Sequence, residues 1–63
     1  MRLNIINFNQ AESVLGQDVM IEIMTCLERN DDQAIDDIMV SHPELNYVLF
    51  WVGERRDIIF IMP

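Results

Sequence analysis

The sequence predicts an α+β fold, a small single domain with the element order β-α-α-β-β, in which two helices pack on one face of a three-stranded sheet. The stretch 46–62 contains two runs of β-branched and aromatic residues around the polar segment Gly-Glu-Arg-Arg, which is the pattern of a C-terminal β-hairpin. Between residues 10 and 41, apolar side chains instead recur at intervals of three and four, which is typical of amphipathic helices. We expect residues 1–63 to form one domain, because a chain of 63 residues can bury only one small core.

The N-terminal part of the chain predicts a strand followed by a long helix. Residues 2–8 have β-branched residues at their centre and predict the first strand. A helix is expected from about residue 10 to residue 29, with Asn9 as its N-cap and Glu12 at the capping-box position. Its apolar side is formed by Leu15, Val19, Met20, Ile23, Met24, Cys26 and Leu27. Gly16 lies within this helix at a cost of about 1 kcal/mol relative to alanine, which indicates a close approach of the sheet.

A second, shorter helix is expected over residues 33–41. Asn30 is suited to end the first helix in a left-handed conformation, and Asp31 or Asp32 is suited to cap the second. This helix must end by His42, because the next residue is proline, which disfavours helical backbone in the residue before it. If the two helices form an antiparallel pair, the second strand runs antiparallel to the first and the third runs parallel to it.

The turn of the hairpin decides which side chains share a face of the sheet. A two-residue turn at 54–55 and a four-residue loop at 53–56 both pair Val52 with Asp57, whereas a three-residue loop would change every pair. One face, which we term the aromatic face, then holds Tyr47, Leu49, Trp51, Ile58, Phe60 and Met62. The other, which we term the aliphatic face, holds Val48, Phe50, Val52, Ile59 and Ile61.

Both faces of the predicted sheet are apolar, but two helices on one side of the sheet can cover only one of them. We assign the helices to the aliphatic face, because Trp51 and Tyr47 are residue types enriched at protein interfaces. The six residues of the aromatic face are then the predicted interface of a homodimer, which in a standard case buries about 800 Å² per partner. Oligomerisation suits this chain, because the core of so short a protein supplies only about 3–5 kcal/mol and a single cysteine allows no internal disulfide.

Charge and hydropathy exclude several classes of protein. Eleven acidic and four basic residues give a net charge of −7, so we expect no direct nucleic-acid binding. Two of the basic residues, Arg55 and Arg56, are expected at the hairpin tip, where they keep the turn in solvent. The longest apolar run, 47–52, is too short to cross a membrane, and asparagines interrupt the N-terminal apolar stretch that a signal peptide needs. With one free cysteine, these features favour a cytoplasmic protein.

No side-chain pattern in the sequence predicts catalysis. Cys26 falls on the apolar side of a helix near glutamates, which suits a core residue better than a nucleophile. His42 could pair with Ser41 or Asp37, but no third group completes a triad, and a polar residue at a helix end is the simpler interpretation. We therefore expect no catalytic residue and no cofactor.

Acidic residues gather around the second predicted helix: Glu28, Asp31, Asp32, Asp36, Asp37 and Glu44. Their spacing does not fit a calcium loop, so we expect no metal site. The simplest interpretation is a solvated helix face whose first-turn acids suit the helix dipole. The alternative is an acidic docking surface made of Glu28, Asp31, Asp32, Asp36 and Asp37, which would bind a basic partner or imitate nucleic-acid phosphates.

Together, these features predict a small acidic, non-enzymatic protein-binding module. It would act as a regulator or inhibitor by docking on a protein partner, and it would form a homodimer. The alternative function is a nucleic-acid-mimicking decoy, a phage-type inhibitor of a host nucleic-acid-binding or defence protein. The two differ in their response to salt, because exposed charges are screened over about 8 Å at physiological ionic strength.

Overall fold

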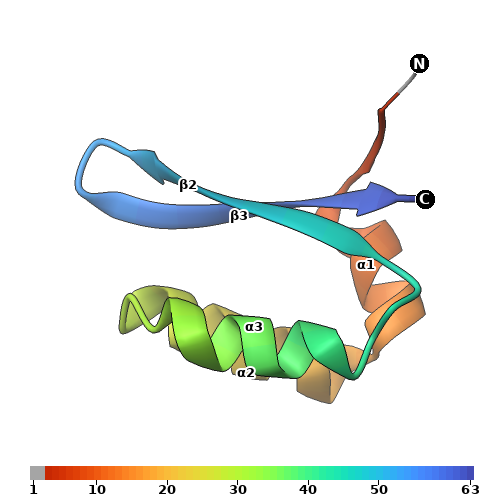
Figure 1. Cartoon of the computed structure of the whole chain (residues 1–63), viewed down its shortest axis with the longest axis horizontal. Helices are drawn as coiled ribbons and strands as arrows, with labels where there is room; N and C mark the ends of the chain where they lie inside the picture. The colour runs from red at the N-terminus through yellow and green to blue at the C-terminus, as the bar shows by residue number, and fades with distance from the viewer. Residues whose placement is uncertain (1–2) are drawn as a thin grey trace.

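Residues 3–63, which the computed structural model describes, form a three-stranded antiparallel sheet with three helices on one of its sides (Figure 1). In chain order the elements are β1 (Asn4–Ile6), α1 (Phe8–Leu15), α2 (Gln17–Glu28), α3 (Asp32–Val40), β2 (Asn46–Val52) and β3 (Arg55–Met62). The predicted α+β class, with its order of strand, helical region and hairpin, is confirmed.

The start of α1 follows β1 after a single residue. Asn7 caps the helix, because its Oδ1 accepts a hydrogen bond from the backbone N–H of Gln10 at 2.8 Å. In return, the Oε1 of Gln10 accepts one from the backbone N–H of Asn7 at 2.9 Å, which completes a capping box. The helix therefore begins at Phe8, with Asn7 as its N-cap, whereas the predicted N-cap was Asn9. The predicted strand 2–8 is correspondingly shorter, and its first residue, Arg2, lies outside the described residues.

The helix predicted over 10–29 is broken at Gly16. Gly16 has φ 94° and ψ 154°, and it ends α1 and precedes α2. This backbone region is accessible almost only to glycine. An added Cβ at Gly16 would meet no atom within 4 Å, so the glycine is required for its conformation and not for a close approach of the sheet. The predicted single helix was wrong on this point.

Replacing Gly16 with alanine distinguishes a broken helix from a continuous one by the sign of the effect. At the observed φ and ψ, Gly16→Ala is expected to lower the free energy of unfolding by about 1–3 kcal/mol. In a continuous helix, the same change would raise it by about 1 kcal/mol. Chemical denaturation of both proteins gives the sign, with the exposed Gln17→Ala as a control that we expect to change little. A stabilised Gly16→Ala variant would contradict the break.

The link between α2 and α3 follows the sequence prediction. Asn30 adopts a left-handed conformation with φ 55°. Asp31 caps α3, because its Oδ1 accepts a hydrogen bond from the backbone N–H of Ala34 at 3.2 Å. The helix ends at Val40, before His42, as predicted.

The orientation of the hairpin strands relative to β1 differs from the prediction. β3 lies between β1 and β2 and is antiparallel to both, so β2 runs parallel to β1. We predicted the reverse orientation for both strands of the hairpin. Three helices separate β1 from β2, whereas the predicted orientation assumed a single antiparallel pair of helices.

A two-residue turn at 53–54 joins β2 to β3 and pairs Val52 with Arg55. Gly53 has φ 60°, and glycine at this first turn position is typical of a type II′ turn. The predicted partner of Val52 was Asp57, so the predicted register was wrong by two residues. A shift of two residues leaves the alternation of side chains unchanged, and both predicted faces therefore keep their members.

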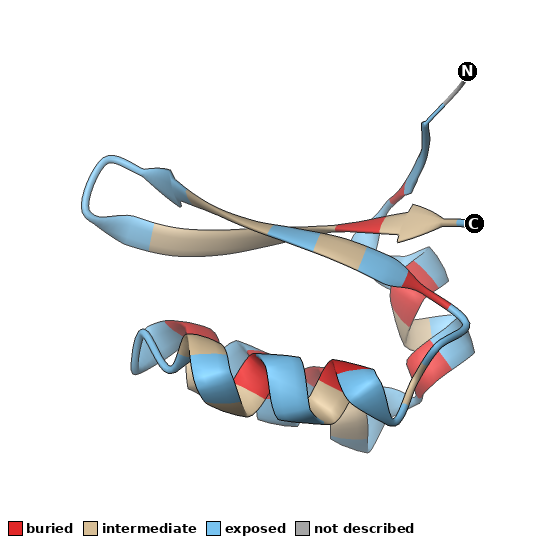
Figure 2. Cartoon of the chain, in the orientation of Figure 1, coloured by how far each residue is buried: buried red, intermediate tan, exposed pale blue. Residues whose placement is uncertain are grey.

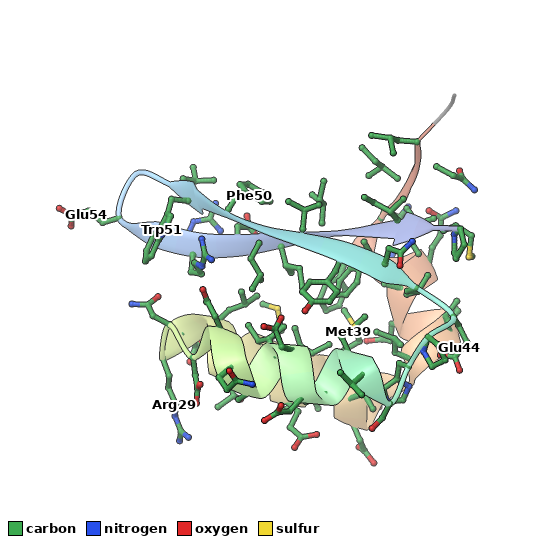
Figure 3. The ribbon with its side chains drawn as sticks, viewed as in Figure 1. Arg29, Met39, Glu44, Phe50, Trp51 and Glu54 are labelled. Atoms are coloured by element: carbon green, nitrogen blue, oxygen red, sulfur yellow. The ribbon has the colours of Figure 1, made fainter. Side chains whose placement is uncertain are left out.

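The helices cover the aromatic face. Phe60 is 3% exposed and belongs to the core, which also contains Ile6, Ala11, Leu15, Met20, Ile23, Leu27, Ile35, Met39 and Leu45. Partly buried residues of the same face pack against this core: Tyr47, Leu49, Ile58 and Met62. Buried positions lie where the helices and the sheet face one another (Figure 2). Figure 3 shows Met39 pointing from α3 toward the sheet and Phe50 on the side of the sheet away from the helices.

The prediction that the helices cover the aliphatic face was therefore wrong. Of the six residues predicted to form the dimer interface, five contact the core, and Trp51 alone is strongly exposed, at 55%. The physical reason lies in two polar groups on the aromatic face, the Tyr47 hydroxyl and the Arg56 guanidinium. Both find acidic partners on α3, so this face can pack against a helix and still satisfy its polar groups.

Candidate functional site

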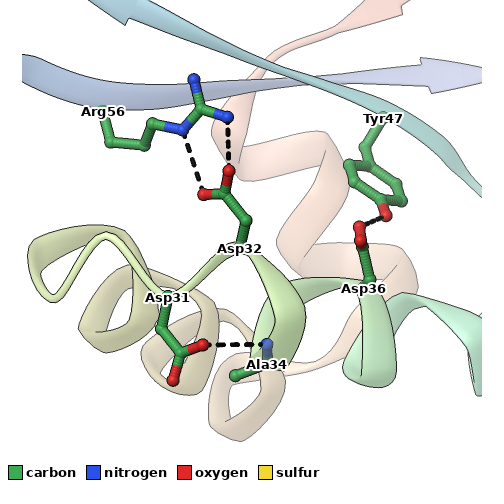
Figure 4. Close-up of polar contacts among 6 residues, drawn as sticks. All are labelled: Asp31, Asp32, Ala34, Asp36, Tyr47 and Arg56. Carbon is green, nitrogen blue, oxygen red and sulfur yellow. Dashed lines mark hydrogen bonds and ion pairs between the residues drawn. The ribbon is translucent and has the colours of Figure 1, made fainter.

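Arg56 ties the hairpin to the first turn of α3 (Figure 4). Its Nε donates to Asp32 Oδ1 at 3.1 Å and its Nη2 donates to Asp32 Oδ2 at 2.7 Å, which is a bidentate ion pair. The hydrogen bond lowers the pKa of the Asp32 carboxyl and raises the pKa of the Arg56 guanidinium. The same guanidinium lies 4.9 Å from the centre of the Trp51 ring, within the range of a cation–π interaction. Arg56 was predicted to lie in solvent at the hairpin tip, and this prediction was wrong.

Tyr47 makes the second polar connection between the sheet and α3. Its hydroxyl donates a hydrogen bond to Oδ1 of Asp36 (Figure 4). Asp32 and Asp36 are four residues apart and so lie on the same side of α3, where they contact β3 and β2 respectively. The hydrogen bond to Asp36, together with burial, raises the pKa of Tyr47 to about 12.

The pKa of Tyr47 can be measured directly, because this residue is the only tyrosine in the chain. We expect its near-ultraviolet absorbance to titrate at about pH 12, compared with the ordinary tyrosine pKa of 10.0. Because the folded pKa is raised, the stabilisation is fully present below the ordinary pKa and is lost as the pH rises through the folded value. An Asp36→Ala variant should titrate closer to the ordinary value. A wild-type midpoint at the ordinary value, with the fold intact by circular dichroism, would contradict the contact.

The predicted acidic docking surface has structural roles at four of its five positions. Asp31 caps α3, Asp32 pairs with Arg56, Asp36 accepts from Tyr47, and Asp37 accepts from the side-chain Nε2 of Gln33 at 3.1 Å. Glu28 is exposed at the end of α2. The structure therefore brings Asp32 and Asp36 together on the sheet-facing side of α3, where they stabilise the fold.

Cys26 and His42, the two residues considered for catalysis, lie on α2 and after the end of α3 respectively. Cys26 is partly buried and packs against the core. The Nδ1 of His42 lies 3.8 Å from Oε2 of Glu44, and Ser41 is the C-cap of α3. Within residues 3–63 there is no group of three or more His, Cys, Asp or Glu side chains suited to hold a metal ion. No helix in the same range is both long and apolar enough to cross a membrane.

The aliphatic face is the part of the sheet that no helix covers (Figures 1 and 2). Val48 is 45% exposed and Val52 is 47% exposed, while Phe50, Ile59 and Ile61 are partly exposed. Ile5 of β1 pairs with Ile61 and extends this face. The only charged side chains on the strands of this face are Arg55 and Asp57, which form an ion pair with 3.3 Å between Nη1 and Oδ2. The surface is thus a broad apolar patch whose two charges neutralise each other.

The contribution of β1 to this patch is absent from the sequence prediction. Ile5 is 55% exposed and Leu3, just before the strand, is 69% exposed. Both occupy alternate positions, so they face the same side of the sheet. The alternation of Leu3 and Ile5 in the sequence indicates that both side chains lie on one face of a strand. The sequence does not show that this face continues the aliphatic face, because that depends on the pairing of β1 with β3.

Comparisons of this chain with protein-family models, with curated proteins and with solved structures find no match.

Proposed function

We propose that this chain is a non-enzymatic protein-interaction module that forms a homodimer through its aliphatic face. One observation carries the proposal: the helices leave one whole side of an apolar sheet uncovered. Single exposed apolar residues are common on protein surfaces, whereas a contiguous apolar patch marks an interaction site or a risk of aggregation.

The length of the sheet along this face is compatible with a dimer interface. A standard interface buries about 800 Å² of each partner, and the whole described chain exposes 4530 Å². The eight residues of β3 extend over about 27 Å along this face. Two such sheets stacked at the usual spacing of about 10 Å would make four layers, helices outside and sheets inside. A two-fold axis would make the interface self-complementary.

The charge distribution supports the same arrangement. The acidic residues of α2 and α3 lie in the helical layer, which is on the opposite side of the sheet from the aliphatic face. In a face-to-face dimer, these charges point away from the second copy. The net charge of −7 on each copy therefore opposes association only weakly.

The solution mass over a range of concentrations, at low and high ionic strength, tests this proposal. We expect a transition from monomer to dimer with a midpoint that changes little with salt. A monomer at every concentration would overturn the dimer. A chain that stays monomeric and binds a folded nucleic-acid-binding protein with an affinity that falls steeply with salt would instead favour the nucleic-acid-mimicking decoy.

A further inference from the structure

We infer that the outer edge of β2 binds an extended, basic polypeptide segment as a fourth strand of the sheet. This site is separate from the aliphatic face, and the inference goes beyond the proposed dimer. β2 is at the edge of the sheet, because the strand order is β1-β3-β2. One side of its backbone therefore lacks a neighbouring strand.

The hydrogen bond between Asp57 and Ile58 identifies which groups face outward. The backbone N–H of Ile58 donates to its own neighbour, Asp57 Oδ1, at 2.8 Å, so it points away from β2. Ile58 and its partner Leu49 therefore form a non-hydrogen-bonded pair. Because the pattern alternates, Tyr47, Leu49 and Trp51 direct their backbone N–H and C=O groups toward the outer edge of β2.

The two exposed edges of the sheet differ in their protection. On β3, the edge beyond the short β1 carries Asp57, which satisfies the Ile58 N–H and adds a charge. Natural proteins use such charges, prolines and bulges to prevent strands from pairing at an edge. β2 contains no charged residue and no proline along its seven residues. Its edge is open to an added strand.

A hollow beside this edge indicates the side chains of the ligand. It has a volume of about 770 Å³ and lies between α3 and the start of β2. Its walls include the apolar side chains of Met39, Val40 and Pro43 together with the carboxylate of Asp36. Side chains that an added strand directs to the helix side would enter this hollow, because they share a face with Tyr47.

A lysine or arginine matches this hollow. Its aliphatic stem would lie along Val40, which is 81% exposed, and its charged head would reach Asp36. Asp36 already accepts from Tyr47, but a carboxylate has two oxygens and about four acceptor sites, so a guanidinium can bind as well. The net charge of −7 also favours a cationic segment. Alternate side chains of the segment would continue the aliphatic face and should be apolar.

The test uses a synthetic seven-residue peptide in which arginine and valine alternate, titrated into the isotopically labelled full chain at a concentration at which the protein is monomeric. We expect saturable binding, with amide shifts and slower hydrogen exchange at Tyr47, Leu49 and Trp51. A peptide with glutamate in place of arginine, and one with N-methylated amides along one edge, should not bind detectably. Equal binding of either control peptide would overturn the inference, as would shifts confined to the aliphatic face.

Two variants of the protein test whether the arginine of the peptide contacts Asp36. Asp36→Asn keeps an acceptor for Tyr47 but removes the charge, and it should weaken binding about tenfold. Asp37→Asn, the matched control, should stay within about twofold, because Asp37 does not line the hollow. Equal weakening by both variants would overturn the role of Asp36. If the β2 amides become protected as protein concentration rises without peptide, the edge belongs to a second copy and the inference is wrong.

Discussion

Phe60→Ala is expected to unfold the protein at room temperature. Phe60 is 3% exposed and lies on central strand β3, in contact with the core that the helices provide. Truncating a buried phenylalanine to alanine costs about 3–5 kcal/mol. The whole stability of a chain this short is about 3–5 kcal/mol, so the variant should retain little or no margin. Far-ultraviolet circular dichroism at 25 °C and urea denaturation would show the loss of secondary structure.

Phe50→Ala is the matched control, because it makes the same chemical change on the opposite face. Phe50 is only partly buried and does not belong to the core cluster. We expect the Phe50→Ala monomer to keep its secondary structure and its cooperative unfolding. A folded Phe60→Ala together with an unfolded Phe50→Ala would mean that the helices cover the aliphatic face.

Val48→Asp is expected to abolish the homodimer. Val48 lies on β2 within the aliphatic face and is 45% exposed in the monomer, so the new carboxylate remains in water until two copies associate. Association would then bury an unpaired charge in each copy, which costs about 3–5 kcal/mol. The dissociation constant should rise at least about 100-fold. Sedimentation or light scattering over a concentration series measures this change.

Val40→Asp provides the control for the added charge. Val40 is 81% exposed on α3, in the helical layer and away from the aliphatic face. We expect its dissociation constant to equal that of the wild type within about threefold, since exposed charges interact weakly. If Val40→Asp disrupts the dimer and Val48→Asp does not, the interface lies on the helices.

The sequence predicts those parts of the fold that depend on local pattern. The alternation of apolar residues in 46–62 identifies the hairpin and divides its side chains correctly between two faces. This division is insensitive to the error in the turn, because the predicted and observed registers differ by an even number of residues. Asn30 and Asp31 also behave as their residue types predict, because their roles involve only neighbouring backbone.

The error in assigning the two faces concerns long-range contacts, which composition does not specify. Interface propensity placed Tyr47 and Trp51 outward, but the Tyr47 hydroxyl and the neighbouring Arg56 have acidic partners on α3. Those pairs join residues 11 and 24 positions apart, and nothing in the local pattern links them. Gly16 was predicted to lie within one helix, whereas its positive φ separates α1 from α2. The candidate interface is the aliphatic face and not the aromatic face, because the helices pack against Phe60 and its neighbours.

The most direct test of the central claim is the accessibility of methyl groups to a soluble paramagnetic probe, measured by NMR at low and high protein concentration. We predict that Val48 and Val52 are strongly broadened at low concentration and protected at high concentration, while Ile23 and Ile35 are protected at both. That result would show an aliphatic face that is open in the monomer and closed by a second copy. Protection of Val48 and Val52 at low concentration, or broadening at every concentration, would contradict the account.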